Sequence, residues 1–244
     1  MNFLIVGASA GLGRCLSEEA ARRGHDLLLV SSDSRDLSAM ADSLRLQYGV
    51  RTDYVACQFG NASDEEEAVV SAAKKFGPID VLMYPLGFAQ DDDTGFLDSQ
   101  MALRLVSINF LSQASLTAAL WPVLLEREQA SVVGFGSVAA VRGRRRNVVY
   151  AAAKRALTSY FESLRHLAVG TNIRVHFFQL GYLDTQQAFG RHLLLPKGSP
   201  ERLARLVLDR LPRAGGSVFY PWFWGPISRA LRLVPWFIYA RLEL

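Results

Sequence analysis

Cysteine and histidine are scarce in this chain. Its 244 residues include two cysteines, Cys15 and Cys57, and four histidines, with no ligand-like spacing among them. Isolated thiols exclude a disulfide framework and are typical of a reducing compartment. The acidic run Asp91–Asp93 is expected to form a solvated loop, because three consecutive side chains cannot all converge on one ion. We therefore assign no metal site.

Long apolar runs are also missing. No stretch approaches the ~20 uninterrupted apolar residues of a membrane-spanning helix. The first residues, Asn2 to Val6, already have the pattern of a buried strand that runs into a glycine turn, so we expect no signal peptide. The sequence thus predicts a cytoplasmic protein, with one qualification that concerns its C-terminal end.

The chain also lacks a large excess of charge of one sign. Lys and Arg number 27 against 23 Asp and Glu, which gives a formal net charge of +4. A nucleic-acid-binding surface needs clustered basic charge, and the one dense basic cluster in this chain is short. We expect no nucleic-acid partner. With 50% hydrophobic and 20% charged residues, the composition is that of a globular domain.

What the sequence does contain is a regular alternation of short apolar runs and longer helical patterns. Several runs are continuously apolar, as expected for parallel strands covered on both faces. The predicted strands are Phe3–Val6, Asp26–Val30, Arg51–Cys57, Val81–Leu86, Ser131–Gly136, Arg174–Leu180 and Ser217–Tyr220. The predicted helices are Leu12–Arg23, Ser34–Tyr48, Ser63–Phe76, Gln100–Glu126, Val149–Val169 and Pro200–Leu211. This alternation predicts a single-domain α/β fold, a Rossmann-type doubly wound parallel sheet.

A glycine-rich loop joins the first predicted strand to the first predicted helix. It reads Gly7-Ala8-Ser9-Ala10-Gly11-Leu12-Gly13. Glycines allow a tight turn and a close approach to a pyrophosphate, and the helix N-terminus offers free N–H groups and the positive end of its dipole. At this position the loop favours a bound dinucleotide over a purely structural turn.

Tyr150 and Lys154 are four residues apart and share one face of a predicted helix, with three alanines between them. A free phenol titrates near pH ~10, and a neighbouring ammonium lowers that pKa by favouring the phenolate. Taken alone, this pair is common on surface helices. Its meaning depends on the residues that accompany it.

Together, five landmarks resemble the short-chain dehydrogenase/reductase family. They are the glycine pattern Gly7-x-x-x-Gly11-x-Gly13, then Asn109, Ser137, Tyr150 and Lys154 in that order. The resemblance runs from Phe3 to about Tyr220 and implies one catalytic domain over residues 1–220. It further implies an NAD(P)-dependent oxidoreductase that interconverts a ketone and a secondary alcohol.

The resemblance also implies a role for each catalytic residue. Tyr150 would exchange a proton with the carbonyl oxygen, and Lys154 would hold the nicotinamide ribose and lower the tyrosine pKa. Ser137 would hydrogen-bond the substrate oxygen. Asn109 would hold a water that connects Lys154 to solvent, or alternatively its amide only satisfies nearby helix backbone. The implied cofactor-binding residues are Gly7, Ser9, Ala10, Gly11, Leu12, Gly13, Ser31, Ser32, Arg35, Gly87, Tyr150, Lys154, Gly181, Leu183 and Thr185.

Two departures from the family pattern indicate a divergent member. Pro85-Leu86-Gly87 stands where the family often has Asn-Ala-Gly, which alters contacts on the adenosine side. Leu180 replaces the usual proline before Gly181. Neither departure removes a catalytic group.

The residues that follow the second predicted strand favour NADP(H) over NAD(H). An acidic residue at this place normally holds the ribose 2′-hydroxyl and repels a 2′-phosphate. This chain has Ser31 and Ser32 there, with Arg35 nearby, a set that suits a phosphate. Asp33 would favour NAD(H) instead if the strand ended later than predicted.

A loop with four arginines, Arg142-Gly143-Arg144-Arg145-Arg146, lies between Ser137 and Tyr150. Planar guanidinium groups bind phosphates and diphosphates well, so Arg142 and Arg144 are the predicted substrate residues. The alternative is a solvated basic turn.

The C-terminal segment, residues 221–244, is rich in aromatic and basic side chains. Such a segment suits a membrane surface, whereas in the family it often covers the substrate pocket or forms a subunit contact. With the arginine loop, it resembles reductases of keto-sugars on polyprenyl phosphate, notably decaprenylphosphoryl-2-keto-pentose reductases. Both a lipid-linked and a small-molecule carbonyl substrate stay open, as does contact with the inner face of the membrane.

Two other functions compete with a reductase. A non-catalytic dinucleotide-binding sensor or scaffold would have lost Tyr150 or Lys154, and both are present. A nucleotide-sugar epimerase would need an added C-terminal substrate domain, for which the residues after 200 leave no room. We also expect a homodimer or homotetramer, because in the family the two long helices, here Gln100–Glu126 and Val149–Val169, pair between subunits.

Overall fold

Seven parallel strands form one sheet in the order β3-β2-β1-β4-β5-β6-β7. The structure is a computed structural model that describes residues 1–90, 93–184 and 195–242. The strands are β1 (Asn2–Val6), β2 (Asp26–Ser31), β3 (Thr52–Ala56), β4 (Val81–Tyr84), β5 (Ala130–Ser137), β6 (Ile173–Leu180) and β7 (Gly216–Tyr220). The prediction of a doubly wound α/β fold is confirmed, and each predicted strand is present.

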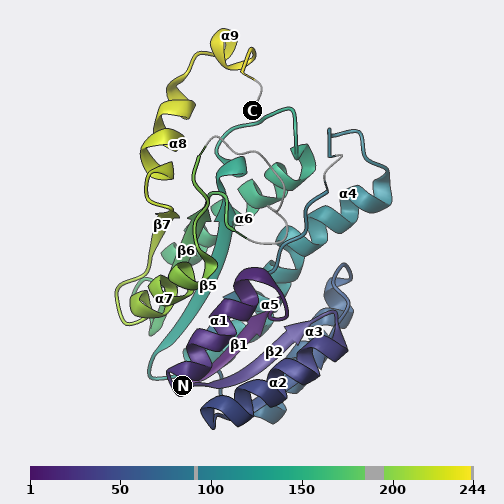
Figure 1. Cartoon of the computed structure of the whole chain (residues 1–244), viewed down its shortest axis with the longest axis vertical. Helices are drawn as coiled ribbons and strands as arrows, with labels where there is room; N and C mark the ends of the chain where they lie inside the picture. Colours follow the sequence, from purple (N-terminus) through teal and green to yellow (C-terminus); the bar gives the residue numbers. More distant parts are fainter. Residues whose placement is uncertain (91–92, 185–194, 243–244) are drawn as a thin grey trace.

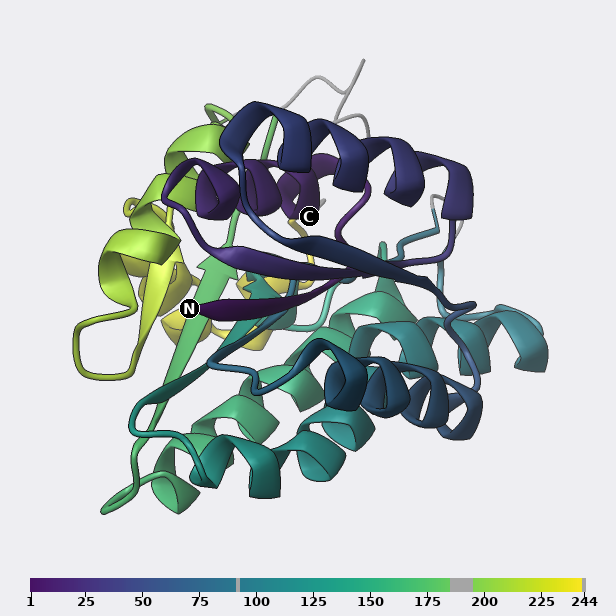
Figure 2. The same ribbon diagram turned by 90° about the horizontal axis from the view of Figure 1, so that it is seen from below.

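Helices cover both faces of the sheet (Figure 2). One face carries α1 (Gly11–Arg22), α2 (Ser34–Tyr48) and α7 (Pro200–Arg210), and the other carries α3 (Ala62–Phe76), α5 (Ser112–Leu125) and α6 (Val148–Leu167). Alternate residues of β1 serve the two cores: Phe3 and Ile5 pack on the first, Leu4 and Val6 on the second. Burial on both faces explains why this strand has no polar alternation.

The strand order reverses direction between β1 and β4. From β1 the chain first builds outward through β2 and β3, then returns to place β4 on the other side of β1. The loops after β1 and β4 therefore diverge to opposite faces. In sheets of this type, the crevice at such a reversal, beyond the carboxyl ends of the strands, is where ligands bind.

The long predicted helix is interrupted by one π-helical turn. It begins as α4 (Ser99–Val106), passes through the turn η1 (Ser107–Leu111) and continues as α5. By length and composition alone, Ser99–Leu125 meets the criteria for a membrane-spanning helix, with a mean hydropathy of 1.3. In the fold, α5 packs against α3 and β5 and buries Leu116, Leu120 and Leu124. This packing accounts for its apolar composition.

The end of the chain forms a separate projection, residues 221–242, which we call the C-terminal arm. It contains α8 (Trp224–Leu233) and the short α9 (Trp236–Tyr239). Figure 1 shows the two yellow helices extending from β7 beyond the end of the sheet.

Gly134 in β5 allows α6 to lie close to the sheet. A Cβ atom at this position would lie 2.3 Å from the ring of Phe161, which is fully buried. We expect Gly134→Ala to lower the free energy of unfolding by about 1–3 kcal/mol, because the ring must move within a filled core. Urea denaturation followed by circular dichroism measures this change.

Gly216→Ala in β7 is the matched control, since no heavy atom lies within 4 Å of its Cβ position. A loss of stability at Gly134 no larger than at Gly216 would contradict the packing argument.

Candidate active site

Two glycines of the loop after β1 are required by close backbone contacts. A Cβ atom on Gly7, which has φ +95°, would lie 2.8 Å from Leu86 Cα. A Cβ atom on Gly13 would lie 1.9 Å from the Gly7 carbonyl oxygen. A side chain at Gly7 would push the loop after β1 away from the loop after β4, and one at Gly13 would push α1 away from the loop after β1. The loop therefore has the close packing that the glycine pattern predicts.

The N-terminus of α1 has no cap of its own. Its N-cap residue, Ala10, provides no side-chain hydrogen bond, and the first turn carries no acidic residue. Uncapped N–H groups and the positive end of the helix dipole suit a negatively charged group. This end of α1 can therefore receive the diphosphate of a dinucleotide, beside Ser9, Gly11 and Leu12.

Two predicted residues for the adenosine side are joined directly. Ser9 Oγ and Ser31 Oγ are 2.7 Å apart and share a hydrogen bond, and Ser31 is buried as the last residue of β2. Ser32 is then the first residue after the strand, and it is exposed.

Arg14 is a neighbour of this pair that sequence reasoning missed. Its Nε and Nη2 donate to the Ser9 carbonyl oxygen at 3.1 and 3.0 Å, which holds the guanidinium beside the glycine loop. It comes directly after Gly13, outside the glycine pattern. No local sequence signal marks it, because its contact with Ser9 O becomes visible only in the fold.

Asp33 is occupied as the N-cap of α2. Its Oδ1 accepts hydrogen bonds from the backbone N–H groups of Arg35 and Asp36 at 3.0 and 3.3 Å. The Arg35 side chain is 93% exposed, and its Nε lies 3.9 Å from the same Asp33 Oδ1. A capping carboxylate is poorly placed to hold a ribose hydroxyl.

Ser137 and Tyr150 are brought together from different elements. Ser137 ends β5, and Tyr150 lies in the first turn of α6. The Ser137 hydroxyl lies close enough to Tyr150 to affect the pKa of the phenol, and Ser137 Oγ accepts from the Ala139 N–H at 3.1 Å. Burial raises the pKa of Tyr150, and the nearby Ser137 hydroxyl and the charge of Arg144 only partly offset this. The expectation of a lowered tyrosine pKa is therefore wrong, because desolvation dominates.

Lys154 lies one turn further along α6 and is 3% exposed. Its Nζ donates to the carbonyl oxygens of Leu86 at 3.3 Å and Phe135 at 3.1 Å. These carbonyls follow β4 and lie in β5, so one ammonium links α6 to both strand ends. Burial lowers the pKa of Lys154 to about 8.

Asn109 lies in the π-helical turn and bridges two segments. Its Nδ2 donates to Leu105 O at 2.9 Å and to Phe88 O, while its Oδ1 accepts from Phe88 N at 3.1 Å. The amide thus takes over Leu105 O, the carbonyl that the backbone N–H of residue 109 would use in an α-helix. Both helix backbone and the loop after β4 depend on this side chain.

Gly87 separates Asn109 from Lys154. A Cβ atom there would lie 3.6 Å from Asn109 Oδ1 and 3.7 Å from Lys154 Nζ. A side chain at Gly87 would begin to fill the space between the amide and the ammonium. The sequence pattern therefore identified a group of residues that the fold does bring together.

Asp93 contradicts the expectation of a solvated acidic loop. It is 1% exposed, and its carboxylate accepts hydrogen bonds from the N–H groups of Val149 and Tyr150. Asp91 and Asp92 lie outside the described residues. The prediction failed because the partners of Asp93 are backbone groups more than 50 positions away in the chain.

Arg142 makes contacts that do not fit its predicted role in substrate binding. Its Nη1 donates to Leu231 O at 2.7 Å and to Val234 O, and its guanidinium carbon lies 4.0 Å from the centre of the Tyr239 ring. The guanidinium therefore holds the C-terminal arm. Arg144 differs, because its charge lies close enough to Tyr150 to affect the tyrosine pKa.

The arm begins directly beside the predicted nicotinamide-contacting segment. A Cβ atom on Gly181 would lie 1.9 Å from Trp224 Nε1, and the Gly181 N–H donates to Tyr220 O at 2.8 Å. Leu183 forms a parallel bridge with Gly198. Thr185 lies outside the described residues.

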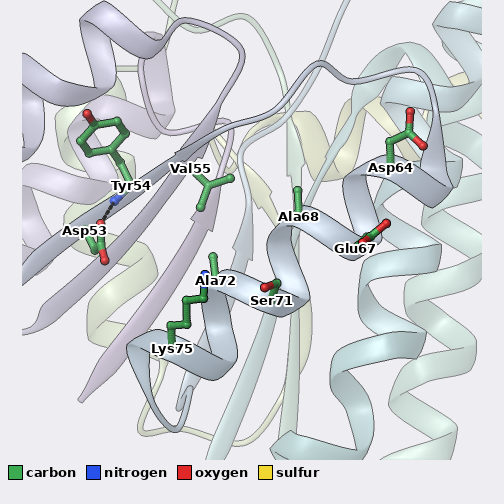
Figure 3. A pocket seen from close by; sticks show the side chains of 9 residues that line it. All are labelled: Asp53, Tyr54, Val55, Asp64, Glu67, Ala68, Ser71, Ala72 and Lys75. Atoms are coloured by element: carbon green, nitrogen blue, oxygen red, sulfur yellow. Dashed lines mark hydrogen bonds between the residues drawn. The ribbon is translucent and has the colours of Figure 1, made fainter.

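A separate groove of about 570 Å³ lies between the edge strand β3 and α3 (Figure 3). It is lined from the strand by Asp53 and Tyr54 and from the helix by Asp64, Glu67 and Lys75. None of the predicted site residues lines it, so it is distinct from the crevice. Within the described part of the chain, no group of three His, Cys, Asp or Glu residues could hold a metal ion.

The doubly wound sheet, the glycine loop and the Ser137–Tyr150–Lys154 group define the class of protein as a dinucleotide-dependent oxidoreductase. The family model of short chain dehydrogenases matches residues 2–191. The chain belongs to the short-chain dehydrogenase family and is an NAD(P)-dependent oxidoreductase.

Individual relatives agree with this assignment. The chain is 30% identical over 241 residues to a hydroxysteroid 11-beta-dehydrogenase 1-like protein of Xenopus laevis, covering 96% of this chain and 81% of that protein. It is 26% identical over 239 residues to an uncharacterised oxidoreductase of Mycobacterium tuberculosis, covering 98% and 96%. A short-chain dehydrogenase from Sphingobium yanoikuyae, solved in complex with NADPH, matches with a TM-score of 0.83 and 25% identity, covering 95% and 93%.

The lowered pKa of Lys154 predicts a pH-dependent affinity for the reduced cofactor. Burial disfavours the ammonium, so the charged form predominates below pH 8 and is lost above it. We expect NADPH affinity, measured by fluorescence titration, to weaken as the pH rises through about 8. Lys154→Met should bind more weakly, with no such dependence. A wild-type affinity that stays constant from about pH 6.5 to 9.5 would contradict the role of the charge.

Proposed function

We propose that this protein reduces a ketone to a secondary alcohol with NADP(H), with Tyr150 as the proton donor. The observation that carries the proposal is that Ser137 and Tyr150 lie close together, with Tyr150 one turn of α6 before the buried Lys154, whose Nζ binds the carbonyls of Leu86 and Phe135. The nicotinamide, when bound, supplies or accepts the hydride. Side chains of this protein would orient the substrate and transfer the proton.

The raised pKa of Tyr150 favours the reductive direction at neutral pH. A neutral phenol can give its Oη proton to the carbonyl oxygen as negative charge develops there. Ser137 Oγ can donate a hydrogen bond to the same oxygen. Lys154 would orient the nicotinamide ribose, and its positive charge would stabilise the phenolate left on Tyr150. Oxidation of an alcohol would need that phenolate at the start and would be favoured at high pH.

The preference for NADP(H) is supported by the arginines beside the crevice. Arg14 contacts Ser9, which is the hydrogen-bonding partner of Ser31, Arg35 follows Ser32 by three residues, and Asp33 is occupied as a helix cap. Guanidinium groups with serine hydroxyls suit a 2′-phosphate. The Sphingobium relative was solved with NADPH, which is in keeping with this preference.

The substrate is proposed to carry an anionic group. Arg144 lies near Tyr150, and its Nε donates to the Arg146 carbonyl oxygen at 3.0 Å. A phosphate attached to the keto compound would pair with the charge of Arg144 while the carbonyl group of the compound reaches Tyr150. A keto-sugar on a lipid phosphate has this chemistry.

The test is turnover of NADPH and NADH with free keto-sugars, lipid-linked keto-sugars and simple ketones. We expect a higher kcat/KM with NADPH, and Tyr150→Phe should lower kcat by about 10²-fold or more while NADPH still binds, because only the transferable proton is lost. Tyr54→Phe on the exposed edge strand β3 is the matched control and should be neutral. Tyr150→Phe with wild-type turnover would rule out the proposed acid.

We propose that the C-terminal segment, residues 221–244, contacts an anionic membrane surface and that residues 1–220 form the catalytic domain. Its tip exposes five apolar side chains, with Leu233 at 83%, Trp236 at 69% and Phe237 at 66% exposure, joined by Ile238 and Leu242. Arg229, Arg232 and Arg241 are also exposed, and Glu243 is the one acidic residue in the sequence from 221 to 244. Exposed aromatic and basic side chains together suit the interface of an anionic bilayer.

Arg142 connects the proposed membrane contact to the site. It lies between Ser137 and Tyr150 in the chain and holds the arm through the carbonyls of Leu231 and Val234. A bilayer bound at the tip would therefore lie near the loop that borders the substrate. This arrangement would suit a substrate whose lipid tail stays in the membrane.

Vesicle co-sedimentation tests the membrane contact. We expect binding to vesicles with phosphatidylglycerol, weaker binding to pure phosphatidylcholine, and about tenfold weaker binding for Trp236→Ser/Phe237→Ser, since burial of each large side chain contributes about 1.5–3 kcal/mol when complete. Leu46→Ser, at an 86% exposed leucine of α2, is the control. If the double variant binds normally, or if it changes the oligomeric state instead, the membrane proposal is wrong.

A homodimer or homotetramer is proposed to form through the long helices. Leu103 of α4 and Leu111 of the π-helical turn are exposed, as is Leu125 at the end of α5. Pairing of these helices between two subunits would cover such side chains.

A further inference from the structure

The helix that carries Tyr150 is not capped by its own sequence. Its N-cap residue, Asn147, has a left-handed backbone with φ 53° and ψ 48°, and its side chain makes no capping hydrogen bond. The first N–H groups of a helix have no partner within the helix and need acceptors from elsewhere. In α6 these acceptors come from Asp93, in the loop after β4.

Asp93 accepts hydrogen bonds from the first three N–H groups of α6. Its carbonyl oxygen accepts from Val148 N at 3.4 Å, its Oδ1 from Val149 N at 3.1 Å, and its Oδ2 from Tyr150 N at 2.9 Å. Oδ1 also accepts from Gly95 N at 3.3 Å, which fixes the carboxylate relative to its own loop. Both carboxylate oxygens are therefore used, and the side chain is buried.

These contacts act on the reacting residue itself. The carboxylate binds the backbone N–H of Tyr150, so a shift of the carboxylate moves the residue whose phenol must meet Ser137. Lys154, one turn later, is fixed separately through Leu86 O and Phe135 O. Asp93 and Lys154 thus hold α6 at two points, one at its first turn and one a turn later. A bond to a charged acceptor is stronger than a neutral one, and the helix dipole favours a negative charge at this end.

We propose that Asp93 is a positioning residue that sets the place of Tyr150 in the site. It touches neither substrate nor cofactor, and it acts through the backbone of the first turn of α6. This proposal rests on the role proposed above for Tyr150. The carboxylate is needed for its two acceptor oxygens, because an amide offers only one and directs N–H groups at the helix N–H.

The test compares Asp93→Asn with Asp98→Asn. Asp98 is the N-cap of α4 and accepts from Met101 N at 2.8 Å, so it offers the same substitution at a helix cap that does not hold α6. We expect Asp93→Asn to lower kcat by about 10- to 100-fold with little change in NADPH affinity, and Asp98→Asn to keep kcat within about threefold. Displacement of the proton donor also slows the chemical step, so the deuterium isotope effect with labelled NADPH should rise only in the Asp93 variant.

Hydrogen exchange of the peptide that spans residues 147–154 provides a readout that needs no turnover. It should speed up in Asp93→Asn and stay unchanged in Asp98→Asn. If no ketone is turned over by the wild type, the proposed function fails, while this measurement still decides whether Asp93 holds the first turn.

Asp93→Glu separates position from charge. It keeps the negative charge at the helix N-terminus but moves the oxygens by about one bond, so kcat should fall although thermal stability is largely kept. An Asp93 variant that keeps wild-type kcat and exchange, or an equal loss of kcat in Asp98→Asn, would overturn the proposal.

Discussion

The buried ammonium of Lys154 is the interaction on which the site depends. A charge in a protein interior is costly unless polar groups surround it, and here the Leu86 and Phe135 carbonyls accept from it. Free carbonyl groups of this kind occur where parallel strands end. The ammonium thus draws α6 against the carboxyl ends of β4 and β5, and this places Tyr150 beside Ser137 and the whole group near the glycine loop.

On the substrate side of the site, a second charged residue, Arg142, holds the C-terminal arm in place. The Nη1 of Arg142 donates to carbonyl oxygens at the C-terminal end of α8, and its guanidinium lies against the ring of Tyr239. Positive charge at a helix C-terminus is favourable. The arm and the loop before α6 therefore behave as one unit, together with Trp224, which packs on Gly181 at the end of β6.

Periodicity and local motifs predicted most of the fold. The apolar runs predicted every strand because a parallel strand covered on both faces leaves a local signature, and the glycine spacing predicted the close approach of α1 to β1. Asn109, Ser137, Tyr150 and Lys154 were identified through a resemblance rather than through any local signal of their own. The single predicted helix Gln100–Glu126 missed its π-helical turn, because that turn depends on the contact of Asn109 with Phe88 in another loop.

The sequence by itself determined the order and type of the elements, the glycine loop and the identity of the residues that can exchange a proton. These properties depend on residues that are close together in the chain, so the sequence alone reveals them. Only the tertiary structure decided that Asp93 is a buried cap and not a solvated acid, that Arg142 holds the arm, and that the pKa of Tyr150 rises. Each of these outcomes depends on partners far away in the sequence or on the exclusion of water, which no local pattern records.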